Sequence, residues 1–183
     1  MQAVLGIVLT NLLAELRVDA ARSRASVYRH GEGEFIMLAR ASTSQLLKRP
    51  GRGRYPDNEG IIGEAWDRGA ALAFELPSTE ARWRSKCTRD WGMSEESVAG
   101  IKMMSRSLVG VRIDADGSTR DPVGLIVVES LDPLGISGEQ ADAITTLPSW
   151  ELTRRVLHEV VECLDDAPRA GAKRASTDRE PDL

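Results

Sequence analysis

Two cysteines are the side chains of this sequence most able to carry out covalent chemistry. Cys87 stands among three basic residues, Arg84, Lys86 and Arg89, and nearby positive charge can lower the pKa of a thiol. A thiolate could attack the sulfur of a sulfoxide, a reaction that a second, resolving thiol completes. The other cysteine, Cys163, lies far along the chain, and the two form neither a C-x-x-C motif nor a zinc-binding spacing.

The aromatic neighbours of Cys87 favour a packing role for this thiol. Trp83, Cys87 and Trp91 follow at i, i+4 and i+8 of a predicted helix, so they share one helical face. A small thiol between two indoles is typical of a face that packs on a core. The two histidines, His30 and His158, are expected at a hairpin turn and in the last helix. We therefore expect no metal site.

A basic cluster stands out in a sequence that is acidic overall. Lys48, Arg49, Arg52 and Arg54 fall within a short loop, whereas the whole chain of 183 residues has a net charge of −4 and a pI of about 5.3. The cluster can hold a phosphate or a carboxylate, or it can be a solvated loop, which is the simpler interpretation. The overall charge gives no reason to expect binding to nucleic acid.

Three glycines frame the apolar stretch EGIIGEAWDRGAALAF. Gly60, Gly63 and Gly69 and the spacing between them predict a loop, a short helix over residues 61–68 and a buried strand over residues 70–76. Gly63 lies inside the predicted helix, where glycine costs up to about 1 kcal/mol relative to alanine. We expect the close approach of another backbone or of a ligand to require it.

The rest of the sequence predicts a sheet between helices. Apolar residues at helical spacing predict helices over residues 3–21 and 138–164, the second kinked at Pro148. One hairpin is predicted where RASVYRH and FIMLARAS flank GEGE, and another where SLVGVRID and PVGLIVVESL flank ADGSTRD. Two further helices are predicted over residues 78–104, on either side of Gly92, and the loop before Gly60 is expected to be mostly irregular.

These segments, in this order, resemble a GAF domain, a small-molecule sensor module of signalling proteins. The resemblance covers roughly residues 5–160 and rests on the first hairpin, on GIIGEAWDRGAALAF and on the VGLI of PVGLIVVES. It implies an α+β fold with a mostly antiparallel sheet of five or six strands, the terminal helices on one face and short helices on the other. We expect one domain over residues 1–165 and a disordered tail over residues 166–183.

The resemblance also implies where a ligand would bind. GAF domains hold ligands between the sheet and the middle helices, although the apolar candidates could also simply fill the core. The family binds cyclic nucleotides, tetrapyrroles, haem, amino acids or oxo-acids, and some members bind nothing, so no cofactor is implied. Bilin attachment would need a cysteine near a histidine, which the sequence does not offer. The expected ligand-binding residues are Trp66, Phe74, Trp83, Trp91, Ile101, Lys102, Met103 and Ser105.

We expect a non-catalytic, cytoplasmic regulatory domain that binds a small molecule or mediates signalling assembly. One alternative is a ligand-free interaction domain. A less favoured alternative is a thiol redox enzyme of the free methionine sulfoxide reductase type, which shares the fold but uses closely placed cysteines that this chain lacks. The absence of a fused output segment in this chain implies a separate output protein or a domain outside the chain.

The terminal helices favour a homodimer. The apolar stripe from Val4 to Leu16 is wider than an edge helix needs, and either a second subunit or the helix's own core could cover it. The uncharged N-terminal run is too short to span a membrane, so membrane attachment would require a longer helix in a longer chain. On the last helix, the apolar residues at suitable spacing are Leu152, Val156, Val160 and Cys163, with Leu157 and Leu164 beside them.

Overall fold

A computed structural model of the chain describes residues 2–49, 51–115 and 122–165. Six strands form one sheet in the order β3-β2-β1-β6-β5-β4, and every neighbouring pair is antiparallel. The predicted tail over residues 166–183 and most of the turn ADGSTRD lie outside the described residues. The strands are β1 (Ser23–Gly31), β2 (Glu34–Ala41), β3 (Arg54–Pro56), β4 (Ala70–Ala73), β5 (Ser107–Asp114) and β6 (Pro122–Ser130).

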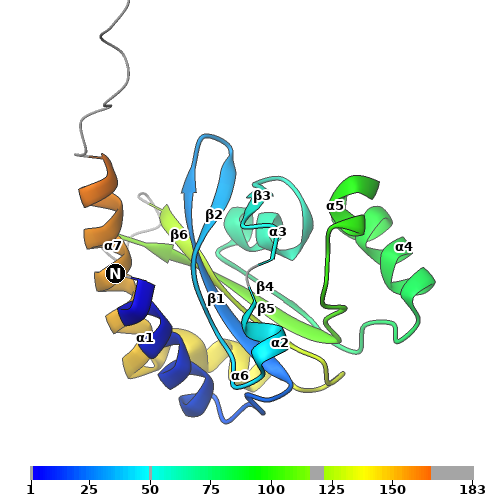
Figure 1. The fold of residues 1–183 in the computed structure, drawn as a ribbon, viewed down its shortest axis with the longest axis horizontal. Coiled ribbons are helices and arrows are strands. Elements are labelled where there is room, and N and C mark those ends of the chain that lie inside the picture. Colours follow the sequence, from blue (N-terminus) through cyan, green and yellow to red (C-terminus); the bar gives the residue numbers. More distant parts are fainter. Residues whose placement is uncertain (1, 50, 116–121, 166–183) are drawn as a thin grey trace, which may run out of the picture.

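Helices cover both faces of this sheet (Figure 1). The helices α1, α6 and α7 lie on one face, and α3, α4 and α5 lie on the other. This arrangement confirms the α+β fold that the sequence predicts. The helices are α1 (Gln2–Glu15), α2 (Gln45–Lys48), α3 (Gly60–Arg68), α4 (Glu80–Trp91), α5 (Glu95–Ala99), α6 (Gly138–Ala143) and α7 (Pro148–Asp165), with a 3-10 turn over Ile144–Thr146.

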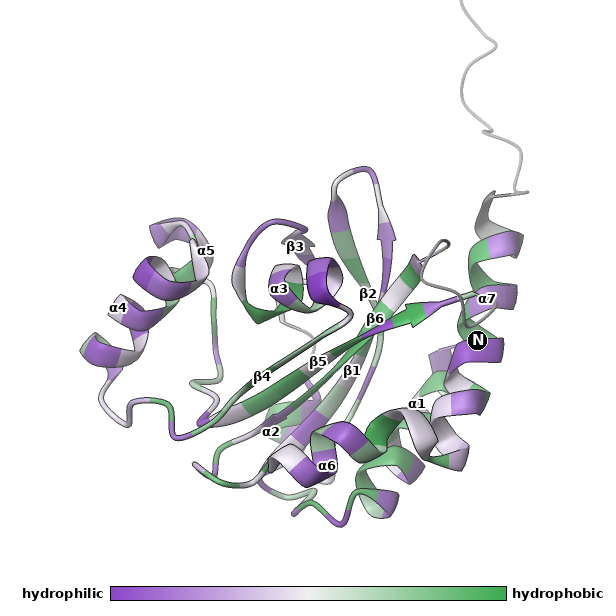
Figure 2. Ribbon diagram, turned by 180° about the vertical axis from the view of Figure 1, so that it is seen from behind, coloured by the Kyte–Doolittle hydropathy of each residue, from purple (hydrophilic) through white to green (hydrophobic). Residues whose placement is uncertain are grey.

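The main hydrophobic core lies between the sheet and the terminal helices. Leu5, Leu9, Leu12 and Leu13 of α1 are each at most 1% exposed, and they pack in one cluster with the inward side chains of the central strands. Most of the apolar stripe of α1 therefore docks on its own sheet. The figure coloured by hydropathy shows hydrophobic strands behind this layer and a largely hydrophilic α4 on the opposite side (Figure 2).

Four local predictions differ from the structure. The first helix ends at Glu15 rather than at residue 21, because the chain turns toward β1 with Arg17 at a φ of 55°. Pro148 begins α7 instead of kinking a longer helix, because its ring suits the first turn of a helix. The loop predicted to be irregular contains α2 and β3, and the strand after Gly69 ends at Ala73.

Two glycines occupy positions with no room for a side chain. A Cβ on Gly63 would lie 2.7 Å from the carbonyl oxygen of Asp57 and 3.0 Å from the carbonyl carbon of Asn58. A Cβ on Gly124 of β6 would overlap the carbonyl oxygen of Tyr28 and lie 2.8 Å from a methyl group of Leu157. The close backbone approach that the sequence predicts at Gly63 is confirmed, since both neighbours of its Cβ are backbone atoms.

Candidate functional site

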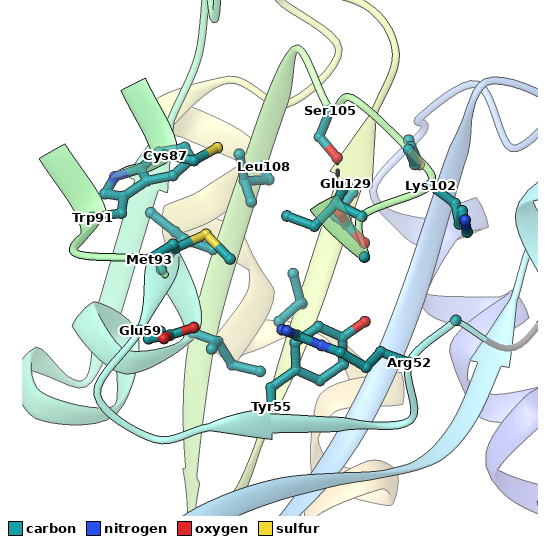
Figure 3. A pocket seen from close by; sticks show the side chains of 18 of the residues that line it. Arg52, Tyr55, Glu59, Cys87, Trp91, Met93, Lys102, Ser105, Leu108 and Glu129 are labelled. Atoms are coloured by element: carbon teal, nitrogen blue, oxygen red, sulfur yellow. Dashed lines mark hydrogen bonds between the residues drawn. The ribbon is translucent and has the colours of Figure 1, made fainter. Parts of the chain in front are cut away.

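A cavity of about 100 Å³ lies between the sheet, the helices α3 and α4, and the chain segments on either side of α5. Figure 3 shows Cys87, Trp91 and Met93 on one side of it, and Ser105 with Glu129 on another. An apolar protein cavity of about 150 Å³ holds benzene, so this volume is of the order that suits a small metabolite. The cavity combines an apolar wall from α4 with a polar floor from the strands.

The register of the central strands builds the polar floor. Arg24 of β1 lies opposite Glu129 of β6, and its Nε donates a hydrogen bond of 2.6 Å to Oε2 of that carboxylate. The hydroxyl of Ser105 donates to Oε1 of Glu129 at 2.7 Å. Burial by itself would raise the pKa of Glu129, but the adjacent Arg24 and the Ser105 hydroxyl outweigh burial and hold that pKa below its ordinary value. Glu129 is therefore ionised and paired at neutral pH.

Arg40 of β2 is a second buried cation in the cavity lining. Its side chain is 8% exposed, and it lies opposite Ser26, whose hydroxyl accepts a 2.9 Å hydrogen bond from Nε. The Nη1 nitrogen donates to the carbonyl oxygen of Arg49 at 2.9 Å. The Nη2 nitrogen is buried and has no hydrogen-bond partner. An unpaired buried donor costs about 1–3 kcal/mol, so this nitrogen needs an explanation.

Glu59 carries the second unpaired polar atom of the cavity lining. It precedes α3, and its Oε1 accepts a hydrogen bond of 3.2 Å from the backbone N–H of Ser94. Its Oε2 is buried without a partner. Burial by itself would raise the pKa of Glu59, but the polar groups of Ser97 and Ser94 outweigh it and hold the pKa below its ordinary value. Glu59 therefore presents a negatively charged oxygen to the cavity.

Cys87 lies in the apolar wall as a neutral thiol. It is 1% exposed and packs in one cluster with Trp83 and Trp91, which confirms the predicted shared face of the helix. Burial raises the pKa of the Cys87 thiol to about 11 and outweighs the lowering effect of Lys86. The thiolate that the basic neighbours suggested is thus absent at neutral pH, because removing the thiol from water disfavours its charged form.

Cys163 cannot act with Cys87 in the folded chain. It is exposed on α7, whereas Cys87 is on α4, and these helices cover opposite faces of the sheet (Figure 1). A disulfide requires Cα atoms within about 7 Å of each other. Any redox cycle at Cys87 would therefore need a thiol from outside the chain.

The structure brings most of the expected ligand-binding residues together. Phe74 is 50% exposed just after β4 and lies away from the cavity lining. Trp66 also lies elsewhere: it stacks on His30 with ring centroids 4.3 Å apart and meets Phe35 edge-on. Trp66 lies on the side of α3 that packs toward the first hairpin. Helical spacing alone could not show which side of α3 faces the hairpin and which faces the cavity. The six that line the cavity are Trp83, Trp91, Ile101, Lys102, Met103 and Ser105.

The basic loop contributes one residue to the cavity mouth. The guanidinium of Arg52 lies 4.6 Å from the ring centre of Tyr55, and both residues line the cavity. The other three basic residues of the loop are absent from the lining. Arg54 instead pairs with Glu34 on the surface. Of the four basic residues suggested as a phosphate or carboxylate site, only the exposed Arg52 is therefore placed to contact a molecule in the cavity.

The charged residues of the cavity floor were missed from the sequence. Arg24, Arg40 and Glu129 each stand in a strand whose other buried positions are uncharged. A charge at a position that alternation places inside a sheet is a signal that could have found them, because such groups are rarely buried unless they are paired or functional. Glu59 carried no comparable signal, since it lies in a loop.

Two other features, a metal-binding cluster and a membrane-spanning helix, are absent from the described part of the chain. Residues 2–49, 51–115 and 122–165 contain no group of three histidine, cysteine or acidic side chains placed to hold a metal ion. Within the same ranges, no helix combines the length and the apolar character needed to cross a membrane.

Solved structures similar to this chain include both GAF domains and enzymes. The type II free methionine-R-sulfoxide reductase from Thermoplasma acidophilum matches with a TM-score of 0.58 at 12% identity, over 86% of this chain and 92% of that one. The free methionine-R-sulfoxide reductase from Neisseria meningitidis, solved with its substrate, matches with a TM-score of 0.55 at 14% identity, over 88% and 80%. A phycoerythrobilin-bound GAF domain from a cyanobacterial phytochrome matches with a TM-score of 0.55 at 15% identity, over 88% of each chain.

These likenesses establish a GAF-like fold and correct one expectation. No protein-family model matches the sequence, and no curated protein does. Identities near 15% show the fold alone. The expectation that the chain is not an enzyme, which rested on its lack of closely placed cysteines, is overturned, because two free methionine-R-sulfoxide reductases share its fold and the fold therefore does not exclude catalysis. The fold is common to signalling domains and to enzymes, so function has to be argued from the cavity.

Proposed function

We propose that this chain is a regulatory domain that binds a small molecule in the cavity between the sheet and the helices α3 and α4. The cavity itself carries the proposal, because it joins an apolar wall to a floor of charged groups. Small-molecule sites are typically mostly apolar, with a few convergent polar groups that fix the orientation of the ligand. The similar structures include one domain with a bound bilin and one enzyme with bound substrate, which supports the proposal. We take residues 1–165 as the domain.

A cavity-filling substitution tests this proposal. Met93 is half-buried on the wall, so Met93→Trp should fill the cavity without disturbing the main core. A metabolite collection is screened by thermal unfolding against the parent and this variant. A ligand at 100 times its Kd stabilises a protein by about 2.7 kcal/mol, which raises Tm by roughly 5 °C or more for a chain of this length. We expect at least one compound to stabilise the parent and not the variant; no such compound would refute the proposal.

Thiol-dependent reduction of a sulfoxide is a second candidate, favoured by the position of Cys87 in the cavity wall. The Cys87 sulfur would attack the sulfoxide sulfur, giving a thioether and a sulfenic acid on Cys87. One external thiol would convert the sulfenic acid to a mixed disulfide with loss of water. A second would release a disulfide and restore the Cys87 thiol. Two external thiols are consumed for each sulfoxide reduced.

Turnover of free methionine sulfoxide by the full chain with dithiothreitol tests the second candidate. Activity that Cys87→Ser abolishes and Cys163→Ser leaves intact would establish it. Equal activity in the parent and Cys87→Ser would exclude it. The raised pKa of Cys87 predicts that any such activity increases with pH as the thiol ionises.

We further propose that two copies pair through the terminal helices. Once α1 has docked on its own sheet, the large apolar residues that these helices leave exposed are Val4, Ile7 and Leu152, at 48%, 63% and 46% exposure. A symmetric pair would bury each patch against its partner. A separate output protein and a cytoplasmic location remain predictions from the sequence.

Sedimentation measures this pairing. Ile7→Glu with Leu152→Glu places charges in the exposed patch and should convert a dimer to a monomer without unfolding it. Leu9 and Leu13 are unsuitable targets because both are buried in the single chain. A parent that is monomeric at tens of micromolar, or a dimer unaffected by both substitutions, would contradict the proposal.

A further inference from the structure

We infer that the outer face of α4 is a docking surface for an acidic helix of a partner protein. This surface is distinct from the cavity and does not depend on a ligand there. It is an open groove, which we call the α4 groove, lined by Pro77, Ala81, Arg82, Ser85, Lys86, Arg89 and Asp90.

Helix α4 has two faces of opposite character. The face toward the cavity carries the two tryptophans and the thiol described above. Arg82, Lys86 and Arg89 follow at i, i+4 and i+7, so they share another face. At 3.6 residues per turn, the two sets are centred roughly 130° apart around the helix axis. The basic set therefore faces solvent, in agreement with the hydrophilic surface of α4 in Figure 2.

The charge of the α4 groove is positive and only partly compensated. Three cations and one carboxylate line it, and that carboxylate, Asp90, is already paired with Lys86 at 2.7 Å. Among the described residues, Arg82 and Arg89 have no carboxylate partner, and Nε of Arg89 donates to a carbonyl oxygen of its own helix. The remaining ion pair of α4 lies outside the lining. Two guanidinium groups are thus available to carboxylates from outside the chain.

The spacing of the three cations suits the side chains of a second helix. At 1.5 Å per residue, Lys86 lies about 6.0 Å along the axis from Arg82, and Arg89 lies about 4.5 Å farther. Carboxylates four and three residues apart on a partner helix have the same rises, whereas same-side residues of an extended chain recur every 6.7 Å or so. Ala81 and Ser85, also in the lining, are small, so a second helix can approach closely.

The composition of the α4 groove argues against two other negatively charged partners. Among the described residues that line it, none is aromatic, so exposed bases of a nucleic acid would find no stacking surface. None of them is a large apolar residue that could insert into an anionic membrane. The net charge of −4 over the whole chain also opposes long-range attraction to either polyanion.

The α4 groove lies far from the proposed pairing surface. Figure 1 shows α4 at the opposite end of the molecule from α1 and α7. A homodimer formed through the terminal helices would therefore leave the α4 groove open on each copy. This position suits a partner other than a second copy of the chain.

Fluorescence anisotropy of labelled peptides, titrated with the full chain, tests the inference. The first probe is an alanine- and glutamine-based helical peptide of about 15 residues, with three glutamates spaced by four and three residues. The second probe has glutamines in place of the glutamates, and the third has three glutamates on different faces of the helix. We expect the first probe to bind at least tenfold more tightly than the second and at least threefold more tightly than the third, with an affinity that falls as salt is added. No binding of the first probe, or equal binding of the first and third, would overturn the inference.

Two double variants with the same change in net charge locate the contact. Arg82→Gln with Arg89→Gln removes two exposed cations of the α4 groove and should weaken the first probe at least fivefold. Arg68→Gln with Arg155→Gln removes two exposed cations from α3 and α7 and should change that affinity less than twofold. Equal weakening by the two double variants would show attraction to the overall charge and would overturn the assignment to α4.

A DNA oligonucleotide and vesicles that contain phosphatidylserine test the remaining classes of partner. We expect both to bind the full chain more weakly than the first probe does. If either binds at least as tightly and loses affinity in the variant Arg82→Gln with Arg89→Gln, the groove belongs to that class of partner and the inference is wrong. The peptide titrations contain no cavity ligand, so their outcome is independent of the screen that tests the proposed function.

Discussion

The same six strands support two faces with opposite chemistry. On the face of the terminal helices, the inward side chains of β1 and β6 are mainly apolar and pack in one cluster with α1. On the face of α3 to α5, the alternate positions of these strands carry Arg24 and Glu129, and an open cavity remains. The two faces therefore differ in content: one holds the main hydrophobic core, and the other holds a buried ion pair and two buried polar atoms without partners.

The largest expected effect comes from breaking the ion pair of the cavity floor. Glu129→Leu leaves Arg24 buried without its partner and should destabilise the chain by about 3–5 kcal/mol. Urea unfolding measures the change. The double variant Arg24→Met with Glu129→Leu should recover most of the loss, because an apolar pair of similar volume replaces a buried ion pair at little cost.

The same pair predicts a pH dependence. The folded-state pKa of Glu129 is lowered, so the stability that it contributes is present above about pH 4.5 and is lost as the pH falls through the folded pKa. The double variant should lose less stability than the parent on acidification. If Arg24→Met with Glu129→Leu were as unstable at pH 7 as Glu129→Leu alone, the ion pair itself would stabilise the fold. That result would contradict the assignment of fold stability to the opposite, apolar face.

A truncation in the apolar layer should have the next largest effect. Leu9 is fully buried, so Leu9→Ala should cost about 2–5 kcal/mol through lost burial and a new cavity. Ile7→Ala, on the same helix but 63% exposed, should change stability by less than about 0.5 kcal/mol. Similar losses of stability in Leu9→Ala and Ile7→Ala would refute the docking of α1 on the sheet. Ile7→Ala should also leave any ligand affinity of the cavity on the opposite face unchanged.

Gly63 tests how tightly the cavity face is packed. Gly63→Ala would place a Cβ 2.7 Å from the Asp57 carbonyl oxygen, so we expect a loss of about 1–3 kcal/mol despite the better helix propensity of alanine. In contrast, Gly6→Ala in α1 meets nothing within 4 Å and should stabilise the chain by up to about 1 kcal/mol. Thermal unfolding of the two variants in opposite directions is the expected result.

The smallest expected effect concerns the chemical reactivity of the Cys87 thiol and not the stability of the fold. With a pKa of about 11, on the order of one thiol in a thousand is ionised at pH 8, and the side chain is buried. Iodoacetamide should therefore modify the exposed Cys163 at least tenfold faster, as followed by mass spectrometry. Comparable rates at the two sites would indicate an open cavity wall.

The raised pKa also has a stability consequence at high pH. The fold favours the neutral thiol, so the stability linked to Cys87 is complete below pH 9 and is lost as the pH rises toward 11. Cys87→Ala should lack this loss, and Cys163→Ala should retain it.

Periodicity in the sequence was enough to predict the fold and part of the cavity. The two hairpins, the helix around Gly63 and the separation of two helices at Gly92 were all predicted, because each depends on local spacing. The position of Trp66 could not be predicted, since both sides of α3 pack against apolar surface.

The polar floor was not predictable from local patterns for a different reason. Arg24 and Glu129 meet only through the register of β1 against β6, and Arg40 meets Ser26 only through the register of β1 against β2. The charges were visible in the sequence, but their partners were not. Pairing across a sheet is a long-range property that residue spacing does not encode.

The strand order has a consequence for how the chain folds. The N-terminal strand β1 takes its central place only when it pairs with β6, whose residues lie about a hundred positions later in the chain. Such distant pairing slows folding, because a long loop must close before the contacts can compensate for the lost chain entropy. During synthesis on the ribosome, the first hairpin can therefore form early but must wait for β6. A nascent chain that stops short of β6 lacks Val127 and Glu129, so the cavity lining is complete only after β6 has been synthesised.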